Sequence, residues 1–172
     1  GRIRGADAGG AGTGMAAGIA VMACMGGAQA ASGTVELRLA AKPDFHAVEM
    51  GDTVVTAIGG SGELSVRNSG GRPFIDGANA EFRFAGFAKA TPSGRELEAD
   101  AVATFGPEDT LLLVFERHAS DAGAQDEGSL QLAGGSGRFA GVSGECRYRL
   151  EEPPGEWNVT ATCDWLYVFP YR

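Results

Sequence analysis

The stretch GGSGRFAGVSG, residues 134–144, decides the fold of this chain, because five glycines and two serines surround one Arg-Phe pair. Glycine at this density allows positive φ angles, β-bulges and close approach of neighbouring backbones. Phe139 is the one large apolar side chain that the stretch can bury. The segments on either side, SLQLAG and ECRYRLEE, alternate in the manner of strands. The stretch therefore predicts a tight turn that leads into a β-strand.

Glycine-rich turns also bind phosphates, so a nucleotide site is the first functional interpretation to test. A Walker loop needs a Lys-Ser or Lys-Thr pair and a following helix, and a dinucleotide-binding GxGxxG motif also opens a helix. The stretch has no lysine, and the residues that follow it alternate as a strand. The sequence therefore argues against a nucleotide site.

Composition indicates a single all-β domain. The 172 residues are enough for one domain with a sizeable core and too few for two. A helical bundle would not tolerate 28 glycines, whereas an all-β domain with many turns uses them. The net charge of −8 and the pI near 4.7 disfavour nucleic acid and anionic membrane surfaces as partners. Two histidines and three cysteines are too few and too scattered for a standard zinc site, so we expect no metal.

The glycine-rich stretch resembles the allene oxide cyclase and dirigent superfamily, in which a GGSGxFxGxxG segment joins two neighbouring strands of a barrel. The matching residues are Gly134, Gly135, Ser136, Gly137, Phe139, Gly141 and Gly144. Upstream, the order of a strand (RELEADAVATF), a GPEDT turn, an apolar strand (LLLVF) and a short strand (SLQLAG) is similar as well. The resemblance covers residues 95–150. It implies a trimeric barrel that holds a small apolar molecule in its lumen and, in the enzymes, steers cyclisation or radical coupling without a cofactor.

The first 30 residues are typical of a secretory signal. Two arginines and a glycine-rich segment precede the apolar run MAAGIAVMACMGG, and Ala28-Gln29-Ala30 has the form of a cleavage site. We therefore expect 1–30 to be a signal peptide or disordered leader and 31–172 to be one barrel domain, secreted or periplasmic and without a membrane span. The alternative is a lipoprotein anchored through Cys24, with Val21-Met22-Ala23-Cys24 as its cleavage box.

Alternation in the first half of the domain predicts strands at 34–40, 53–58 and 63–67, separated by a loop at 42–52 and a glycine-rich turn at 59–63. His46 and Glu49 in the first loop are interpreted as solvated, because two ligands do not make a metal site. A longer loop, 68–79, carries Phe74 and Ile75 at its tip. It is either a lid or rim segment or an oligomer contact.

The next two segments predict strands with one apolar face each. In 80–89, Phe82 and Phe84 share a face, and Ala85-Gly86 allows a bulge that returns Phe87 to the apolar side. In 95–105, one face consists of Leu97 and three alanines. Small side chains there leave room inside a barrel.

The segment TLLLVFERH, 110–118, is apolar on both faces from Leu111 to Phe115. A two-sided apolar strand in an antiparallel sheet indicates that the outer face is covered as well, and we expect another subunit to cover it in a homo-oligomer, either dimer or trimer. Glu116 and His118 share one face at the end of this strand. They are either solvated or enter the barrel mouth.

The last two segments predict a hairpin closed by a disulfide. If residues 153–156 form its loop, Glu152 lies opposite Trp157 and Cys146 falls opposite Cys163. This register separates an apolar face (Cys146, Tyr148, Leu150, Val159, Ala161, Cys163, Trp165 and Tyr167) from a polar one (Arg147, Arg149, Thr160 and Thr162). In an exported protein the two cysteines would form a disulfide, whereas in the cytosol they would be buried free thiols.

Together these patterns predict a small closed antiparallel eight-stranded barrel of lipocalin-like shape, with an immunoglobulin-like sandwich as the less suitable alternative. Two functions follow from such a barrel. The first is binding of a small hydrophobic molecule by lumen residues drawn from Phe82, Phe84, Tyr148, Trp165 and Tyr167. The second is a cofactor-free cyclase, isomerase or dirigent-like coupling protein that uses a buried acid or phenol among Glu98, Asp100, Glu116 and Tyr148. A structural barrel with a filled core is the third alternative, because the same aromatics also pack ordinary cores.

Overall fold

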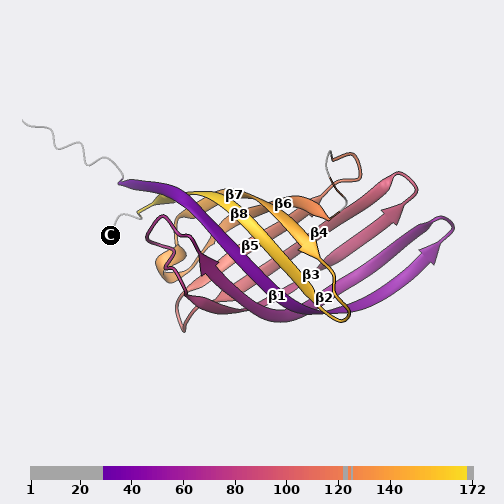
Figure 1. Cartoon of the computed structure of the whole chain (residues 1–172), viewed down its shortest axis with the longest axis horizontal. Helices are drawn as coiled ribbons and strands as arrows, with labels where there is room; N and C mark the ends of the chain where they lie inside the picture. The colour runs from indigo at the N-terminus through magenta and orange to yellow at the C-terminus, as the bar shows by residue number, and fades with distance from the viewer. Residues whose placement is uncertain (1–28, 122–123, 125, 170–172) are drawn as a thin grey trace, which may run out of the picture.

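The structure is a closed antiparallel β-barrel, given by a computed structural model that describes residues 29–121, 124 and 126–169. The strands follow one another around the barrel in chain order, and β8 pairs with β1 to close it (Figure 1). They are β1 (Ala30–Met50), β2 (Thr53–Arg67), β3 (Asn79–Thr91), β4 (Gly94–Thr104), β5 (Thr110–Arg117), β6 (Glu127–Gly135), β7 (Val142–Glu151) and β8 (Trp157–Val168), with a short 3-10 helix, η1 (Gly137–Phe139), between β6 and β7. The predicted eight-stranded antiparallel barrel is confirmed. The leader predicted at 1–30 lies almost wholly outside the described residues.

Alternate residues of each strand point into the barrel and form its core. On β3, Phe82 and Phe84 are buried, and they pair with Ala103 and Ala101 of β4. A large side chain on one strand thus meets a small one on the next, which lets two ring layers fit inside a narrow barrel. The sequence prediction of a small-residue face on β4 is confirmed.

β1 and β2 form one long hairpin, so the predicted loop at 42–52 and glycine turn at 59–63 are wrong. The two strands pair without interruption from Glu36 and Arg67 to Met50 and Thr53. The glycines of β2 serve close packing instead of a turn. A Cβ at Gly62 would overlap the backbone of Ala40, and one at Gly60 would overlap the carbonyl of Lys42 and the ring of Phe84.

The β1–β2 and β3–β4 hairpins project beyond the other strands at one end of the barrel, which we call the hairpin end (Figure 1). The opposite end, where the described chain begins and finishes, is called the terminal end. The bulge predicted at Ala85-Gly86 is absent from the described pairing, because β3 keeps one register with both neighbours. Phe87 therefore points outward and is 45% exposed, a correction to its predicted place on the apolar side.

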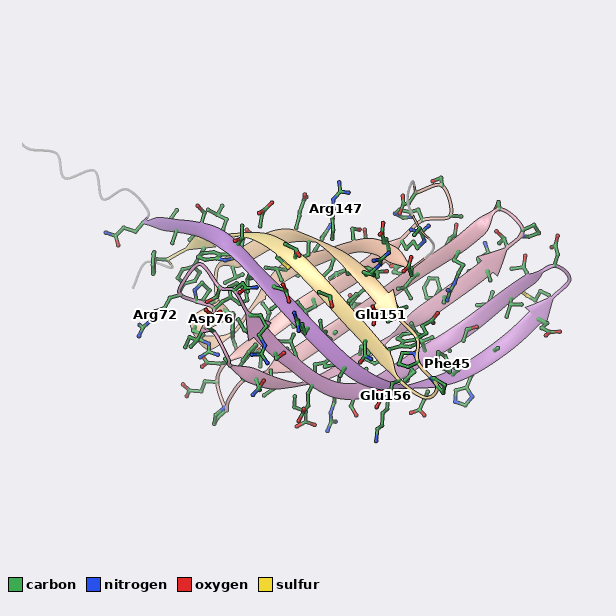
Figure 2. The ribbon with its side chains drawn as sticks, viewed as in Figure 1. Phe45, Arg72, Asp76, Arg147, Glu151 and Glu156 are labelled. Carbon is green, nitrogen blue, oxygen red and sulfur yellow. A yellow bond between two sulfur atoms is a disulfide. The ribbon has the colours of Figure 1, made fainter. Side chains whose placement is uncertain are left out.

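The terminal end of the barrel is filled with aromatic side chains. Phe74 of the 68–78 loop is 1% exposed and packs against Phe139 of η1 and Trp165 of β8, with ring centroids 5.5 and 5.8 Å apart. The loop that carries Phe74 is anchored by backbone hydrogen bonds from Gly70 to Thr34 and from Gly77 to Val66. Figure 2 shows Arg72 and Asp76 of this loop beside the start of β1, far from Phe45 on the β1–β2 hairpin. The segment therefore closes one end of the barrel.

The glycine-rich stretch 134–144 forms the predicted turn between β6 and β7. Gly135 and Gly137 have φ angles of 157° and 57°, in the region that favours glycine. The register shifts where Leu111 pairs with Gly135, which makes the bulge that starts the turn. The turn is fixed to the β4–β5 loop, because the Ser136 hydroxyl donates to the Glu108 carbonyl and Asp109 accepts from the backbone N–H of Arg138. The turn delivers Phe139, which is fully buried, to the terminal end.

The closing hairpin has the predicted register. Cys146 of β7 pairs with Cys163 of β8, and their sulfur atoms are bonded. The predicted inward set is buried or half-buried, and Arg147, Arg149, Thr160 and Thr162 are exposed. The disulfide thus links two adjacent strands from inside the barrel.

Candidate ligand-binding cavity

A cavity lies inside the barrel toward the hairpin end. Its walls are almost entirely apolar, and the volume that the centres of water-sized molecules can reach is about 40 Å³. All eight strands except β6 contribute to its lining, which consists of Leu39, Ala41, Ile58, Phe82, Phe84, Leu97, Ala99, Phe115, Tyr148, Leu150, Trp157 and Val159. The cavity has room for about three water molecules, and its apolar walls favour an apolar occupant.

The cavity exists because the alternation of large and small residues fails at one step of the β3–β4 pair. Phe84 faces Ala101, but the next inward pair is Gly86 and Ala99, both small. Neither residue of this pair has a side chain larger than a methyl group, so the β3–β4 wall leaves space beside the rings of Phe115 and Tyr148. Trp157 of β8 also lines the space, with its ring stacked on Phe84 at 5.8 Å and in edge contact with Phe45 at 5.4 Å.

Tyr148 contributes a polar side-chain atom to the cavity wall. It points inward from β7, is 4% exposed and makes an edge contact with Phe115 at 5.5 Å. Burial raises the pKa of Tyr148 to about 12, against the opposing effect of the nearby Arg117 and Arg95 guanidinium groups. The phenol is therefore protonated at neutral pH, so it can donate a hydrogen bond and cannot act as a base.

A polar recess adjoins the cavity at the hairpin end. It shares Leu97, Tyr148, Leu150 and Trp157 with the cavity and adds Ala88, Arg95, Glu96, Arg117 and Asp126. Arg117 is the last residue of β5 and is 4% exposed. Sequence reasoning missed it, although the inward alternation of Leu111, Leu113 and Phe115 extends to position 117.

The predicted ligand-binding residues fall into two groups. Phe82, Phe84 and Tyr148 line the cavity. Trp165 instead packs at the terminal end, and Tyr167 lies there beside Phe169 with ring centroids 4.6 Å apart. The structure thus brings three of the five together.

The acidic catalytic candidates do not reach the lumen. Glu98 and Asp100 alternate with the inward alanines of β4 and are exposed on the outer surface. Glu116 pairs with Glu98 on that same outer face and is half-buried. The expectation of a buried acid is therefore wrong for Glu98 and Asp100, and among the four candidates only Tyr148 lines the cavity.

His46 and Glu49 are exposed, on the projecting part of β1 and not in a loop. Within residues 29–121, 124 and 126–169, no three His, Cys, Asp or Glu side chains gather as a metal site. The same residues include no helix with the length and hydropathy to cross a membrane.

Fold and cavity together define a closed antiparallel β-barrel with an apolar cavity in its lumen. No protein-family model matches the chain, and no curated protein sequence matches it. The resemblance to the allene oxide cyclase and dirigent barrels stays a prediction that rests on the glycine-rich stretch.

Proposed function

We propose that this protein is an exported barrel that binds a small hydrophobic molecule in its lumen. The observation that carries the proposal is the apolar cavity beside Tyr148, in a barrel whose opposite end is filled by Phe74, Phe139 and Trp165. Apolar cavities with one or two placed polar groups are the usual form of small-molecule sites. The cavity is small, so a ligand larger than a few atoms must displace side chains such as Trp157, which is half-buried.

The cavity favours binding over the two alternatives. A purely structural barrel would fill its lumen throughout, whereas this barrel keeps an apolar cavity toward the hairpin end. A cyclase or coupling enzyme needs groups that move protons or stabilise charge, and Tyr148 is the one predicted candidate that faces the cavity. Catalysis therefore has less support than binding.

Export is supported by the disulfide between Cys146 and Cys163, because such bonds persist in oxidising compartments. Cleavage after Ala30 would leave the whole of β1 except its first residue. The intact mass of the protein purified from its host tests export. A mature chain that begins near Ala31 supports it, and a lipid adduct on Cys24 indicates a lipoprotein. A retained leader contradicts it.

Binding can be tested with a cavity-filling variant. Ala99→Leu adds three carbon atoms to the cavity wall, in a space that holds only about three water molecules. Wild type should bind the neutral apolar dye N-phenyl-1-naphthylamine with a saturable rise in dye fluorescence, at one dye per barrel. The variant should bind it about tenfold more weakly, a loss of about 1.4 kcal/mol.

Ala85→Leu is the matched control, because it makes the same change on the exposed face of β3. It should bind the dye like wild type. Equal near-ultraviolet circular dichroism of the three proteins shows that the barrel is intact. Absence of saturable dye binding to wild type, or equal binding by Ala99→Leu, would contradict the proposed function.

A further inference from the structure

Arg117 is a buried cation with no ion-pair partner among the described residues. It is the one charged residue that is buried within the described part of the chain. Its Nη1 donates to the backbone carbonyl of Glu127, whereas its Nε and Nη2 are buried without a hydrogen-bond partner. A guanidinium has five N–H donors and stays charged at any physiological pH. Leaving such donors unpaired in the interior is unfavourable, so a buried arginine of this kind indicates a group that is supplied from outside the chain.

The carboxylates near the recess are engaged elsewhere. Arg149 pairs with Asp126 at 3.3 Å, and Lys89 with Glu96 at 3.8 Å. Arg95, the other cation of the recess, pairs with Glu152 at 3.6 Å. Arg117 forms no ion pair among residues 29–121, 124 and 126–169. The positive charge of its guanidinium is therefore not neutralised inside the barrel.

The unpaired atoms of Arg117 form a recognition edge. Nε and Nη2 lie on the same side of the planar guanidinium, where their N–H bonds run parallel. Two parallel donors fit the two oxygens of one carboxylate, which is the strongest form of charge-assisted hydrogen bonding in proteins. The third nitrogen, Nη1, is held by Glu127, so the side chain is fixed in place before any ligand arrives.

The position of Arg117 links this edge to the apolar cavity. The recess that Arg117 lines shares Leu97, Tyr148, Leu150 and Trp157 with the cavity, so the two spaces are neighbours behind the same side chains. Tyr148 stands between them as a protonated phenol, able to donate a further hydrogen bond. One molecule could thus present an apolar body to the cavity and an anionic group to the recess.

We propose that the lumen takes a small amphipathic carboxylate, with its apolar body in the cavity and its carboxylate on the Nε and Nη2 edge of Arg117. This inference rests on the proposed function and adds the chemical class of the ligand. Because both nitrogens are shielded from water, the side chains of the recess must shift as the carboxylate enters. A phosphate dianion or sulfate also accepts from both donors of an arginine edge, but its second negative charge would have no matching charge on Arg117, which makes it a poorer match in a buried site.

The test compares two probes of almost equal shape, 2-naphthoate and its methyl ester, on the oxidised wild-type chain by titration calorimetry at pH 7. The carboxylate should bind about tenfold or more tightly than the ester, because only the carboxylate can pair with Arg117. This comparison needs no variant. Arg117→Met should abolish the preference by weakening naphthoate about tenfold and leaving the ester unchanged or tighter.

Arg147→Met is the matched control, because Arg147 is exposed and points away from the barrel wall in Figure 2. It should keep the preference for naphthoate. If the ester binds wild type as tightly as naphthoate does, the carboxylate inference fails while the proposed function stands. If N-phenyl-1-naphthylamine does not bind wild type, the proposed function itself fails. Retention of the preference in Arg117→Met would also overturn the assignment to Arg117.

Discussion

At the scale of single residues, the buried phenol of Tyr148 makes the free energy of unfolding depend on pH in the alkaline range. Its pKa is raised to about 12 in the folded chain by burial, against about 10 for a solvated phenol. Below pH 10 the phenol is protonated in both the folded and the unfolded chain, so Tyr148 does not make the free energy of unfolding depend on pH there. Between pH 10 and 12 the unfolded chain loses the proton while the folded chain keeps it, so the free energy of unfolding falls by about 2 to 3 kcal/mol.

Tyr148→Phe should remove this part of the pH dependence. Urea unfolding at pH 9, 10, 11 and 11.5 measures it, and wild type should lose stability more steeply than the variant above pH 10. Tyr167→Phe is the control, because Tyr167 is only partly buried in the same hairpin. Parallel pH profiles for wild type and Tyr148→Phe would show that Tyr148 titrates as an ordinary phenol in the folded barrel.

The sequence predicted that Tyr148 points into the barrel and that Phe139 is buried, but it predicted neither for Arg117. Large apolar side chains favour the core, so Phe139, the one large apolar residue of its glycine-rich turn, could be predicted to be buried. A charged residue at a strand terminus normally lies in solvent. Arg117 points inward because β5 keeps its alternation up to its last residue, which pairs with Leu97. The sequence contains this alternation, but the preference of charged side chains for solvent argued against extending it to an arginine. The outward direction of Glu98 and Asp100, by contrast, follows from the predicted alanine face.

At the scale of elements, two glycine-rich segments of similar composition take different structures. Residues 134–144 form a turn with positive φ angles, whereas 59–63 lie within β2. Gly60 and Gly62 are there because β1 and Phe84 come too close for any Cβ. The close approach of another strand depends on residues that are distant in the sequence, so it cannot be predicted from the composition of the segment itself. The hairpin of β7 and β8 could be predicted because the Pro-Pro-Gly loop fixes one register, and this register separates the apolar from the polar residues on the two faces.

The disulfide should stabilise that hairpin measurably. It joins residues 17 apart in sequence, and the chain-entropy estimate for such a loop is about 3 kcal/mol. Reduction of wild type, or the double change of Cys146 and Cys163 to Ala, should lower the melting temperature by about 10 °C. Differential scanning calorimetry with and without reductant measures the effect. The double variant is the control, since reductant should not change its melting temperature. Equal melting temperatures of oxidised and reduced wild type would refute the expected stabilisation by the disulfide.

At the scale of the whole molecule, the outer surface bears on assembly. Val102 and Leu112 pair across β4 and β5 on the outside of the barrel and are 41% and 40% exposed. Half-buried Val114 follows them on the same face of β5. A second exposed apolar group, Leu166, Val168 and Phe169, lies where β8 ends. The outward apolar face of β5 is therefore present as predicted, and self-association through it stays a prediction.

Leu112→Glu tests whether β5 lies in a subunit interface. A carboxylate at the centre of an apolar contact would have to be buried without a partner, which costs several kcal/mol and should dissociate the assembly. If the protein is a dimer or trimer through this face, light scattering at micromolar concentration should give that mass for wild type and the monomer mass for the variant. Leu166→Glu makes the same change on β8 and should keep the wild-type mass. A monomeric wild type would contradict self-association, and dissociation by Leu166→Glu alone would place the interface on β8 instead of β5.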